Sequence, residues 1–189
     1  MNKIIYDIDQ MIAEAWDDYN SKRYFSALMI SLMLPDICSK IKFNSRKSKH
    51  INYVNWCNKW LNIYFGGILP NLAFDYKDKF GEIIYQLRCS LLHNGENDIS
   101  EFVPHFFRVT HFSLFIDEEK SFFDNSIISS NEKATGLLQH KNDFDIKINL
   151  GYLIFSIIQS VLLFKDKSKI CDESFPTMEI EIFNNRKGD

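Results

Sequence analysis

Cysteine is scarce in this sequence, and no two cysteines have the spacing of a zinc site or a redox pair. The chain has four, and none of them belongs to a CxxC motif. Disulfide frameworks and structural zinc sites use paired or closely spaced cysteines, so the sequence predicts neither. The chain also opens without the pattern of a signal peptide, and we therefore predict a cytoplasmic protein with reduced thiols.

Common nucleotide-binding motifs and a strong overall charge are also missing. The sequence contains no glycine-rich phosphate loop, no GxGxxG fingerprint, no internal repeat and no low-complexity tract. Its net charge is −3, which by itself does not indicate a nucleic-acid-binding protein. We predict no cofactor and no metal, and any contact with nucleic acid has to come from a local concentration of basic residues.

Apolar residues, in contrast, are plentiful. They make up 46% of the 189 residues and include 17 Phe and 8 Tyr, which is enough for a folded core. Their spacing predicts a mainly α protein, a bundle of four to five helices with a small β-hairpin or sheet as decoration. We predict one domain over residues 1–166, with a helical core at 1–97 and 150–166 and a β-rich insertion at 98–149. A loosely packed tail follows at 167–189.

The most informative stretch is residues 76–95, YKDKFGEIIYQLRCSLLHNG, which is predicted to form one helix. Its apolar residues fall on one side: Phe80, Ile83, Ile84, Leu87 and Leu91. The opposite side carries a strip made by Asp78, Glu82, Tyr85, Cys89 and Leu92. Arg88 and His93 flank this strip, about 140° apart. A helix that buries its apolar side points both residues away from the core, so we expect something outside this chain's own core to meet the strip.

The segment RCSLLHNG at 88–95 resembles the R-x4-6-H signature of the HEPN superfamily, the higher eukaryote and prokaryote nucleotide-binding domains. Many of these small helical proteins are metal-independent RNases. The resemblance implies a HEPN-like bundle that forms a homodimer and cuts RNA in a shared cleft, with Arg88 and His93 as catalytic residues. It implies products that end in a 2′,3′-cyclic phosphate. It also implies a bacterial toxin or antiphage effector, with an antitoxin or regulatory protein as a possible partner.

The chemistry of metal-free RNA cleavage suits these two residue types. A base must remove the 2′-hydroxyl proton, a cation must stabilise the phosphorane, and an acid must protonate the leaving 5′-oxygen. Histidine can act as base or acid near neutral pH, and arginine can hold phosphate with two parallel hydrogen bonds. One chain supplies one pair and a two-fold dimer supplies two, with the strip residues between Asp78 and Leu92 as the dimer contacts.

Two other functions stay open at this stage. A non-catalytic HEPN-like module would bind RNA, a nucleotide or a partner protein through the same strip. Cys89 favours this alternative, because catalytic members often carry a polar residue directly after the arginine. A structural helical protein would use the strip only as an oligomer interface. Arg88 could also be a plain surface residue, with His93 capping the end of the helix.

Basic residues concentrate between the second and third predicted helices. Residues 37–74 contain no acidic residue, and a loop around FNSRKSKH is predicted to face RNA. The predicted RNA-binding residues are Lys40, Lys42, Arg46, Lys47 and Lys49. A third helix follows near residues 50–65, and its aromatic residues could stack on bases or, as we favour, belong to the core. These aromatic residues are Tyr53, Trp56, Trp60 and Tyr64.

The remaining elements are predicted from spacing alone. A first helix should cover residues 3–20, and a second, very apolar helix should follow from about residue 22. Pro35 should kink that helix or start a new turn. Asp36 could pair with Arg88, although we favour a cap on the turn after the kink.

The second half of the chain is predicted to be richer in strands. Strands are expected within residues 102–116, near 126–129 and near 144–148, with a further edge strand possible at 178–183. His105 and His111 would share a face of a regular strand, near substrate or simply at an edge. A final helix over 150–164 is predicted to be buried against the second helix, with no membrane span expected.

Overall fold

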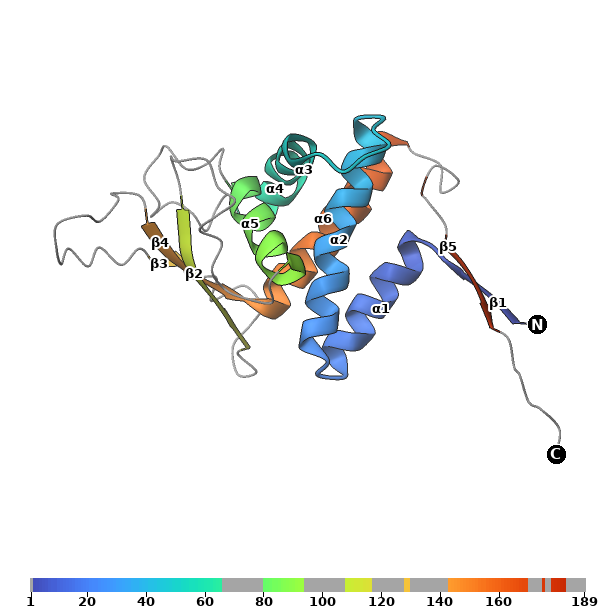
Figure 1. The fold of residues 1–189 in the computed structure, drawn as a ribbon, viewed down its shortest axis with the longest axis horizontal. Coiled ribbons are helices and arrows are strands. Elements are labelled where there is room, and N and C mark those ends of the chain that lie inside the picture. The colour runs from blue at the N-terminus through green and yellow to red at the C-terminus, as the bar shows by residue number, and fades with distance from the viewer. Residues whose placement is uncertain are drawn as a thin grey trace.

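The computed structural model describes residues 2–65, 80–93, 108–116, 128–129, 143–169, 175 and 178–182. The described chain is mainly helical, as predicted, with small β elements (Figure 1). The helices are α1 (Ile8–Asn20), α2 (Tyr24–Lys42), α3 (His50–Trp56), the π-helical turn η1 (Cys57–Leu61), α4 (Asn62–Phe65), α5 (Phe80–His93) and α6 (Leu150–Ser168). The strands are β1 (Asn2–Tyr6), β2 (Arg108–Phe115), β3 (Ile128–Ser129), β4 (Asp143–Asn149) and β5 (Met178–Ile182).

Helix α2 is the element that the other helices surround. It contacts α1, α3, α5 and α6, and its apolar residues are buried on more than one side. Helix α6 packs along it, as predicted, and most of its apolar residues are buried in the core, although Leu162 is exposed. The side chain of Asn149 accepts a hydrogen bond from the backbone N–H of Tyr152 at 3.0 Å and so caps the start of α6. Helix α2 thus packs against α6, α3 and α5.

The predicted start of the first helix is wrong. Residues 2–6 form β1, which pairs antiparallel with β5, and the helix begins only at Ile8. The reason is local, because the side chain of Asp7 accepts a hydrogen bond from the N–H of Gln10 at 2.9 Å. This is an N-cap, and it fixes the helix start one residue after the aspartate.

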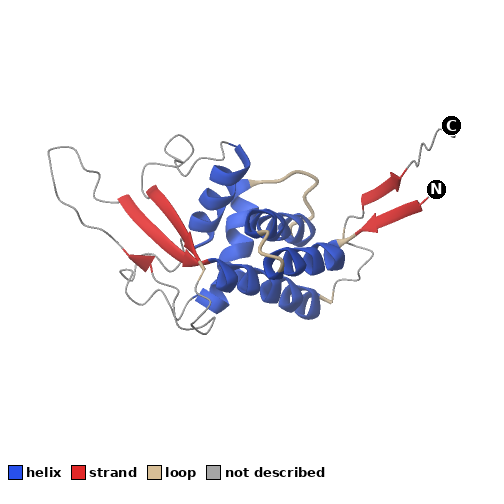
Figure 2. Ribbon diagram, turned by 90° about the horizontal axis from the view of Figure 1, so that it is seen from below, coloured by secondary structure: helices blue, strands red, loops and turns tan. Residues whose placement is uncertain are grey.

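The expected edge strand near the C-terminus is confirmed as β5, and Figure 2 shows the β1–β5 ribbon at one end of the helices and the larger sheet at the other. Phe175 is buried in the hydrophobic core, with Lys165 Nζ 5.5 Å from its ring centre. Most of the predicted loosely packed tail lies outside the described residues, so that part of the prediction stays a prediction.

Pro35 does not end the second helix. Helix α2 runs as one element from Tyr24 to Lys42, with Pro35 buried inside it. A proline lacks the N–H that would bond to the carbonyl four residues earlier, here that of Ser31. Of the two predicted effects of Pro35, a kink or a new turn, the new turn is absent because the helix runs on through this position, and Asp36 lies in the interior of the helix rather than at a cap.

The predicted third helix is confirmed between residues 50 and 65, as α3, η1 and α4 in sequence. Tyr53, Trp56 and Trp60 are buried and Tyr64 packs against the core, so the aromatic residues belong to the interior. The predicted linker at residues 66–79 lies outside the described residues. Helix α5 contains the motif, and its apolar side packs inward as predicted, with Leu91 only partly buried.

The expected strands are confirmed, and they form a small sheet rather than a hairpin. Strand β4 lies between the other two, parallel to β2 and antiparallel to β3. The backbone of His111 pairs with Asp145, and the register shifts between Val109 and His111. Such a shift interrupts the alternation of side chains on which a shared histidine face depends. His105 itself lies outside the described residues.

One described helix, α2, is long and apolar enough to cross a membrane by length and composition alone. Half of that stretch is buried inside the protein, and the core helix of a soluble protein passes the same test. This feature is weak evidence for a membrane span.

Candidate functional site

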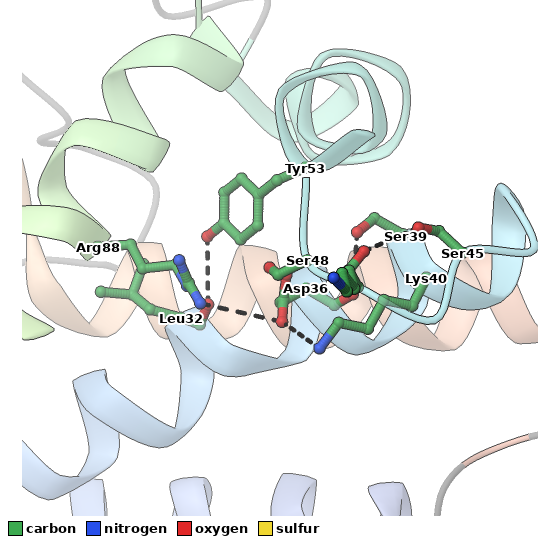
Figure 3. Close-up of polar contacts among 9 residues, drawn as sticks. Leu32, Asp36, Ser39, Lys40, Ser45, Ser48, Tyr53 and Arg88 are labelled. Carbon is green, nitrogen blue, oxygen red and sulfur yellow. Dashed lines mark hydrogen bonds and ion pairs between the residues drawn. The ribbon is translucent and has the colours of Figure 1, made fainter. Parts of the chain in front are cut away.

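Arg88 reaches from α5 to helices α2 and α3. Its Nη2 atom lies 3.9 Å from the carboxylate oxygen Oδ2 of Asp36, and its guanidinium carbon lies 5.4 Å from the ring centre of Tyr53 (Figure 3). Only 16% of the Arg88 side chain is exposed. The guanidinium group is thus held between a carboxylate and an aromatic face, both of which favour a cation. Arg88 is expected to point away from the chain's own core, but most of its side chain is instead covered by residues of α2 and α3.

Asp36 is the centre of this arrangement. Its Oδ2 atom accepts from Lys40 Nζ at 2.8 Å and faces Arg88, and its Oδ1 atom accepts from the hydroxyl of Ser48. Of the two roles considered for Asp36, the structure shows the contact with Arg88, and the favoured cap is wrong. A buried carboxylate is costly unless it is paired, and here two cations and a hydroxyl satisfy it.

Tyr53 forms the wall on which Arg88 rests. Its hydroxyl donates to the backbone carbonyl of Leu32 at 3.2 Å, which fixes the ring against α2. The pKa of Tyr53 is raised well above its ordinary value, chiefly because the phenol is buried. The positive charge of the neighbouring Arg88 offsets only part of this increase. The phenol is therefore a neutral hydrogen-bond donor at physiological pH, and it serves to place the ring beneath the guanidinium group.

The strip on α5 meets helix α3 of the same chain, which the sequence did not indicate. Glu82 Oε2 lies 2.7 Å from Nε2 of His50, and the ring of Tyr85 packs against His50 and Tyr53. Cys89 is buried, whereas Leu92 keeps 38% of its surface exposed. The sequence led us to expect a contact from outside the chain's own core along this strip, but at Glu82 and Tyr85 residues of α3 in the same chain make the contact.

The rest of the predicted site is only partly described. His93 is the last residue of α5, five positions after Arg88, and its side chain lies outside the described residues, as does all of Asp78. The dimer interface is a prediction that one chain does not test.

The predicted RNA-binding residues lie where α2 ends and the following loop begins. Lys42, Arg46, Lys47 and Lys49 are exposed, and Lys40 is half-buried in its ion pair with Asp36. Ser48 belongs to the same loop, and its bond to Asp36 draws the loop toward Arg88 (Figure 3). The structure thus brings the basic segment and the motif arginine to one carboxylate.

Sequence reasoning missed Ser48, His50 and Tyr53 as neighbours of the motif helix. The spacing of Asp36 and Lys40 by four residues was a usable signal, because such pairs meet on a helix. A serine or histidine in a loop carries no comparable pattern, and its contact depends on how α3 packs against α5.

The described residues contain no disulfide and no cluster of metal-binding side chains. No group of three or more His, Cys, Asp or Glu side chains in that part of the chain is placed to hold a metal ion. Cys38, Cys57 and Cys89 are buried free thiols, and burial is the main reason that their pKa values are raised. These thiols are protonated at physiological pH and are poor nucleophiles.

The packing of Tyr85 predicts a loss of stability in alkaline solution. Burial, followed by a hydrogen bond with the Cys89 side chain, raises the pKa of Tyr85 to about 12. Unfolded tyrosine releases its proton near pH 10, so between about pH 10 and 12 only the unfolded state loses this proton. The free energy of unfolding therefore falls as the pH rises through that window, and below it this group has no effect.

Urea unfolding at about pH 9 and about pH 11 measures this loss. The decrease between the two conditions is expected to be smaller in Tyr85→Phe than in the natural sequence, because phenylalanine keeps the ring and has no proton to release. An equal decrease in both proteins would show that Tyr85 does not cause the effect.

No family model, curated protein or solved structure matches this chain.

Proposed function

We propose that this protein is a metal-independent endoribonuclease of the HEPN type, acting as a homodimer. Arg88 binds the phosphate at the cut bond, and His93 transfers a proton to or from the RNA. The basic segment from Lys40 to Lys49 receives the neighbouring phosphates. The R-x4-6-H resemblance and the placement of Arg88 support this proposal.

The main observation in support is that one carboxylate, that of Asp36, contacts both the motif arginine and the basic loop. It faces the guanidinium group of Arg88 and accepts from Ser48 in the basic loop. The two parts were predicted independently, one from a helical motif and one from local charge. A phosphate strand that follows the exposed cations Lys47 and Lys49 is thereby led to Arg88.

The guanidinium group keeps hydrogen-bonding capacity for a phosphate. Its Nη2 contact to Asp36 at 3.9 Å is an ion pair longer than a hydrogen bond, so that carboxylate does not take up the terminal N–H donors. The Nε atom also has no hydrogen-bond partner within the described part of the chain, but it is buried and is not counted as a donor for the phosphate. The planar group offers five N–H donors in a fixed fork. Asp36 and Tyr53 hold that fork in place, so its donors are preorganised for the charge that develops on the phosphorane.

Cleavage of a small RNA with EDTA present tests the proposal. The natural protein is expected to produce fragments that end in a 2′,3′-cyclic phosphate. Arg88→Ala and His93→Ala are each expected to lower the rate by at least about 100-fold, because each removes a group needed in the transition state.

Lys167→Ala is the matched control, since this exposed lysine lies on α6 and loses one positive charge, as Arg88→Ala does. Cutting by both site variants at the natural rate would refute the assignment. Loss of cutting by the natural protein on addition of EDTA would refute the metal-independent mechanism.

The dimer has its own test at Leu92. This residue lies one helical turn after Arg88 and remains 38% exposed, so a partner chain can cover it. Leu92→Glu is expected to shift the protein from dimer to monomer, because a carboxylate in an apolar interface is costly. Light scattering after size-exclusion chromatography measures the mass. A dimer that persists in Leu92→Glu contradicts the proposed interface, and Leu162→Glu, on an exposed apolar residue of α6, is the control.

A non-catalytic binding module is the second candidate, and the environment of Cys89 favours it. The Cys89 side chain is buried and hydrogen-bonded to Tyr85, so it packs inside the protein and is not available to contact a substrate. This candidate predicts RNA binding without turnover, retained in His93→Ala. A filter-binding assay beside the cleavage assay separates the two functions.

A further inference from the structure

A second histidine, on α3, packs against the motif helix α5 beside the proposed site. His50, the first residue of α3, lies with Nε2 at 2.7 Å from Glu82 Oε2, and its ring centre lies 4.4 Å from that of Tyr85. Its side chain remains 41% exposed. A carboxylate oxygen can only accept, so Nε2–H of His50 donates to Glu82 and the ring is fixed in one orientation. The other ring nitrogen, Nδ1, is left to exchange a proton with a ligand.

Two paths of contact connect His50 to Arg88. The first runs through the loop, because Ser48 bonds to Asp36 and lies two residues before His50. Lys49 between them is extended, so residues 48 and 50 point to the same side and are about 7 Å apart. The second path runs through two tyrosine rings. The ring centre of Tyr85 lies 4.4 Å from that of His50 and 5.6 Å from that of Tyr53, and the guanidinium group of Arg88 lies over Tyr53. His50 and Arg88 therefore contact the two members of one tyrosine pair.

We propose that His50 is a further catalytic residue, the general acid of the cleavage, and that Glu82 is its positioning residue. This inference rests on the proposed ribonuclease function and deepens it. In the step, the 2′-hydroxyl proton passes to His93 while the 2′-oxygen forms a bond to phosphorus. The bond from phosphorus to the 5′-oxygen breaks, and the proton of His50 passes to that oxygen. One chain then contains both the base and the acid.

The carboxylate of Glu82 decides how His50 presents its ring. The hydrogen bond from α5 holds Nε2, and Tyr85 packs against the ring, so Nδ1 is the nitrogen that can face a leaving oxygen. Lys47 and Lys49, in the same loop, are the cations that bring the phosphate strand past this histidine.

Two RNA substrates test the assignment, and both assays contain EDTA. One is an ordinary oligonucleotide, and in the other the leaving 5′-oxygen at a single position is replaced by sulfur. A thiolate leaves without being protonated, because thiols are much stronger acids than alcohols, so the second substrate needs no general acid. His50→Gln is expected to cut the first at least about 100-fold more slowly than the natural protein and the second within about threefold. His93→Ala is expected to be slow on both.

Glu82→Gln is the variant that separates positioning from packing. It keeps the size of the side chain and removes the charge, and we expect about a tenfold loss on the oxygen substrate and none on the sulfur substrate. Lys167→Ala, cutting both at the natural rate, is the control. Circular dichroism checks the fold of each variant, and if His50→Gln does not fold, the result for Glu82→Gln decides.

The outcomes distinguish this inference from the function on which it rests. The proposed role of His50 is overturned if His50→Gln cuts the oxygen substrate at the natural rate, or if its cleavage rate falls by the same factor on both substrates. The proposed ribonuclease function is unaffected by either result. If the natural protein cuts neither substrate, both proposals fall.

Discussion

Replacing Gly81 with alanine is expected to lower the free energy of unfolding by about 3 kcal/mol. A Cβ atom at this position would lie 2.3 Å from the carbonyl oxygen of Val54 and 2.8 Å from the side-chain oxygen of Asn58. The first of these is backbone, so it cannot rotate away. Gly81 also donates its N–H to Asn58 at 2.6 Å, which holds the start of α5 against the end of α3 and the beginning of η1. A methyl group must push the two helices apart and break this bond.

Urea unfolding followed by circular dichroism measures the loss. The midpoint is expected to fall while the slope of free energy against urea stays the same, because the surface exposed on unfolding hardly changes. Asn55→Ala is the control, since this residue is exposed on α3 and its loss should change stability by less than about 0.5 kcal/mol. If Gly81→Ala is as stable as the control, the close approach of the two helices is incorrect.

The helices could be predicted because their apolar residues repeat at the helical period. The apolar side of α5, from Phe80 to Leu87, is buried as its spacing requires, and the third helix has the predicted limits. The apolar residues of the stretch 150–164 likewise predicted a buried helix, which is α6 in the structure. In each case burial of an apolar side dominates the energy, and the sequence alone displays that side.

The errors arose where a single polar contact or a distant pairing decides the structure. Residues 2–6 satisfy the helical period, but Asp7 caps the helix after them and β5, far along the chain, offers a strand partner. The π-helical turn η1 adds a residue to a helix without any sequence signal. The pairing of β1 with β5 joins segments far apart in the sequence, and the spacing of apolar residues carries no information about such long-range contacts.

The candidate site was predictable in part for the same reason. Arg88 was found from its motif, and its partner Asp36 was considered and then given the wrong role. Pro35 is expected to kink the helix or start a new turn, which favours Asp36 as a cap. Because α2 runs unbroken from Tyr24 to Lys42, Asp36 lies in the helix interior instead and contacts Arg88, Lys40 and Ser48.

Replacing Asp36 with alanine is expected to cost about 2 kcal/mol of stability and to impair RNA cleavage as well. Arg88 and Lys40 would lose their counter-charge, and the hydroxyl of Ser48 would lose its acceptor. The cost is smaller than for a fully buried pair, because Lys40 is partly exposed and water can solvate it. Asp9→Ala is the matched control. Its carboxylate bonds to Lys165 at 2.8 Å but is largely exposed, so it should cost less than about 1 kcal/mol.

A double-mutant cycle separates the Asp36–Arg88 contact from the other effects. The cycle compares Asp36→Ala, Arg88→Met and the double variant by urea unfolding, with methionine replacing the apolar stem of arginine. We expect the double variant to be about 1 kcal/mol more stable than the sum of the single losses predicts, because removing the guanidinium group relieves the unpaired charge. Purely additive losses would show that 3.9 Å is too far for a useful interaction. Arg88 would then be held by Tyr53 and the surrounding packing, and Asp36 would serve the basic loop through Ser48 alone.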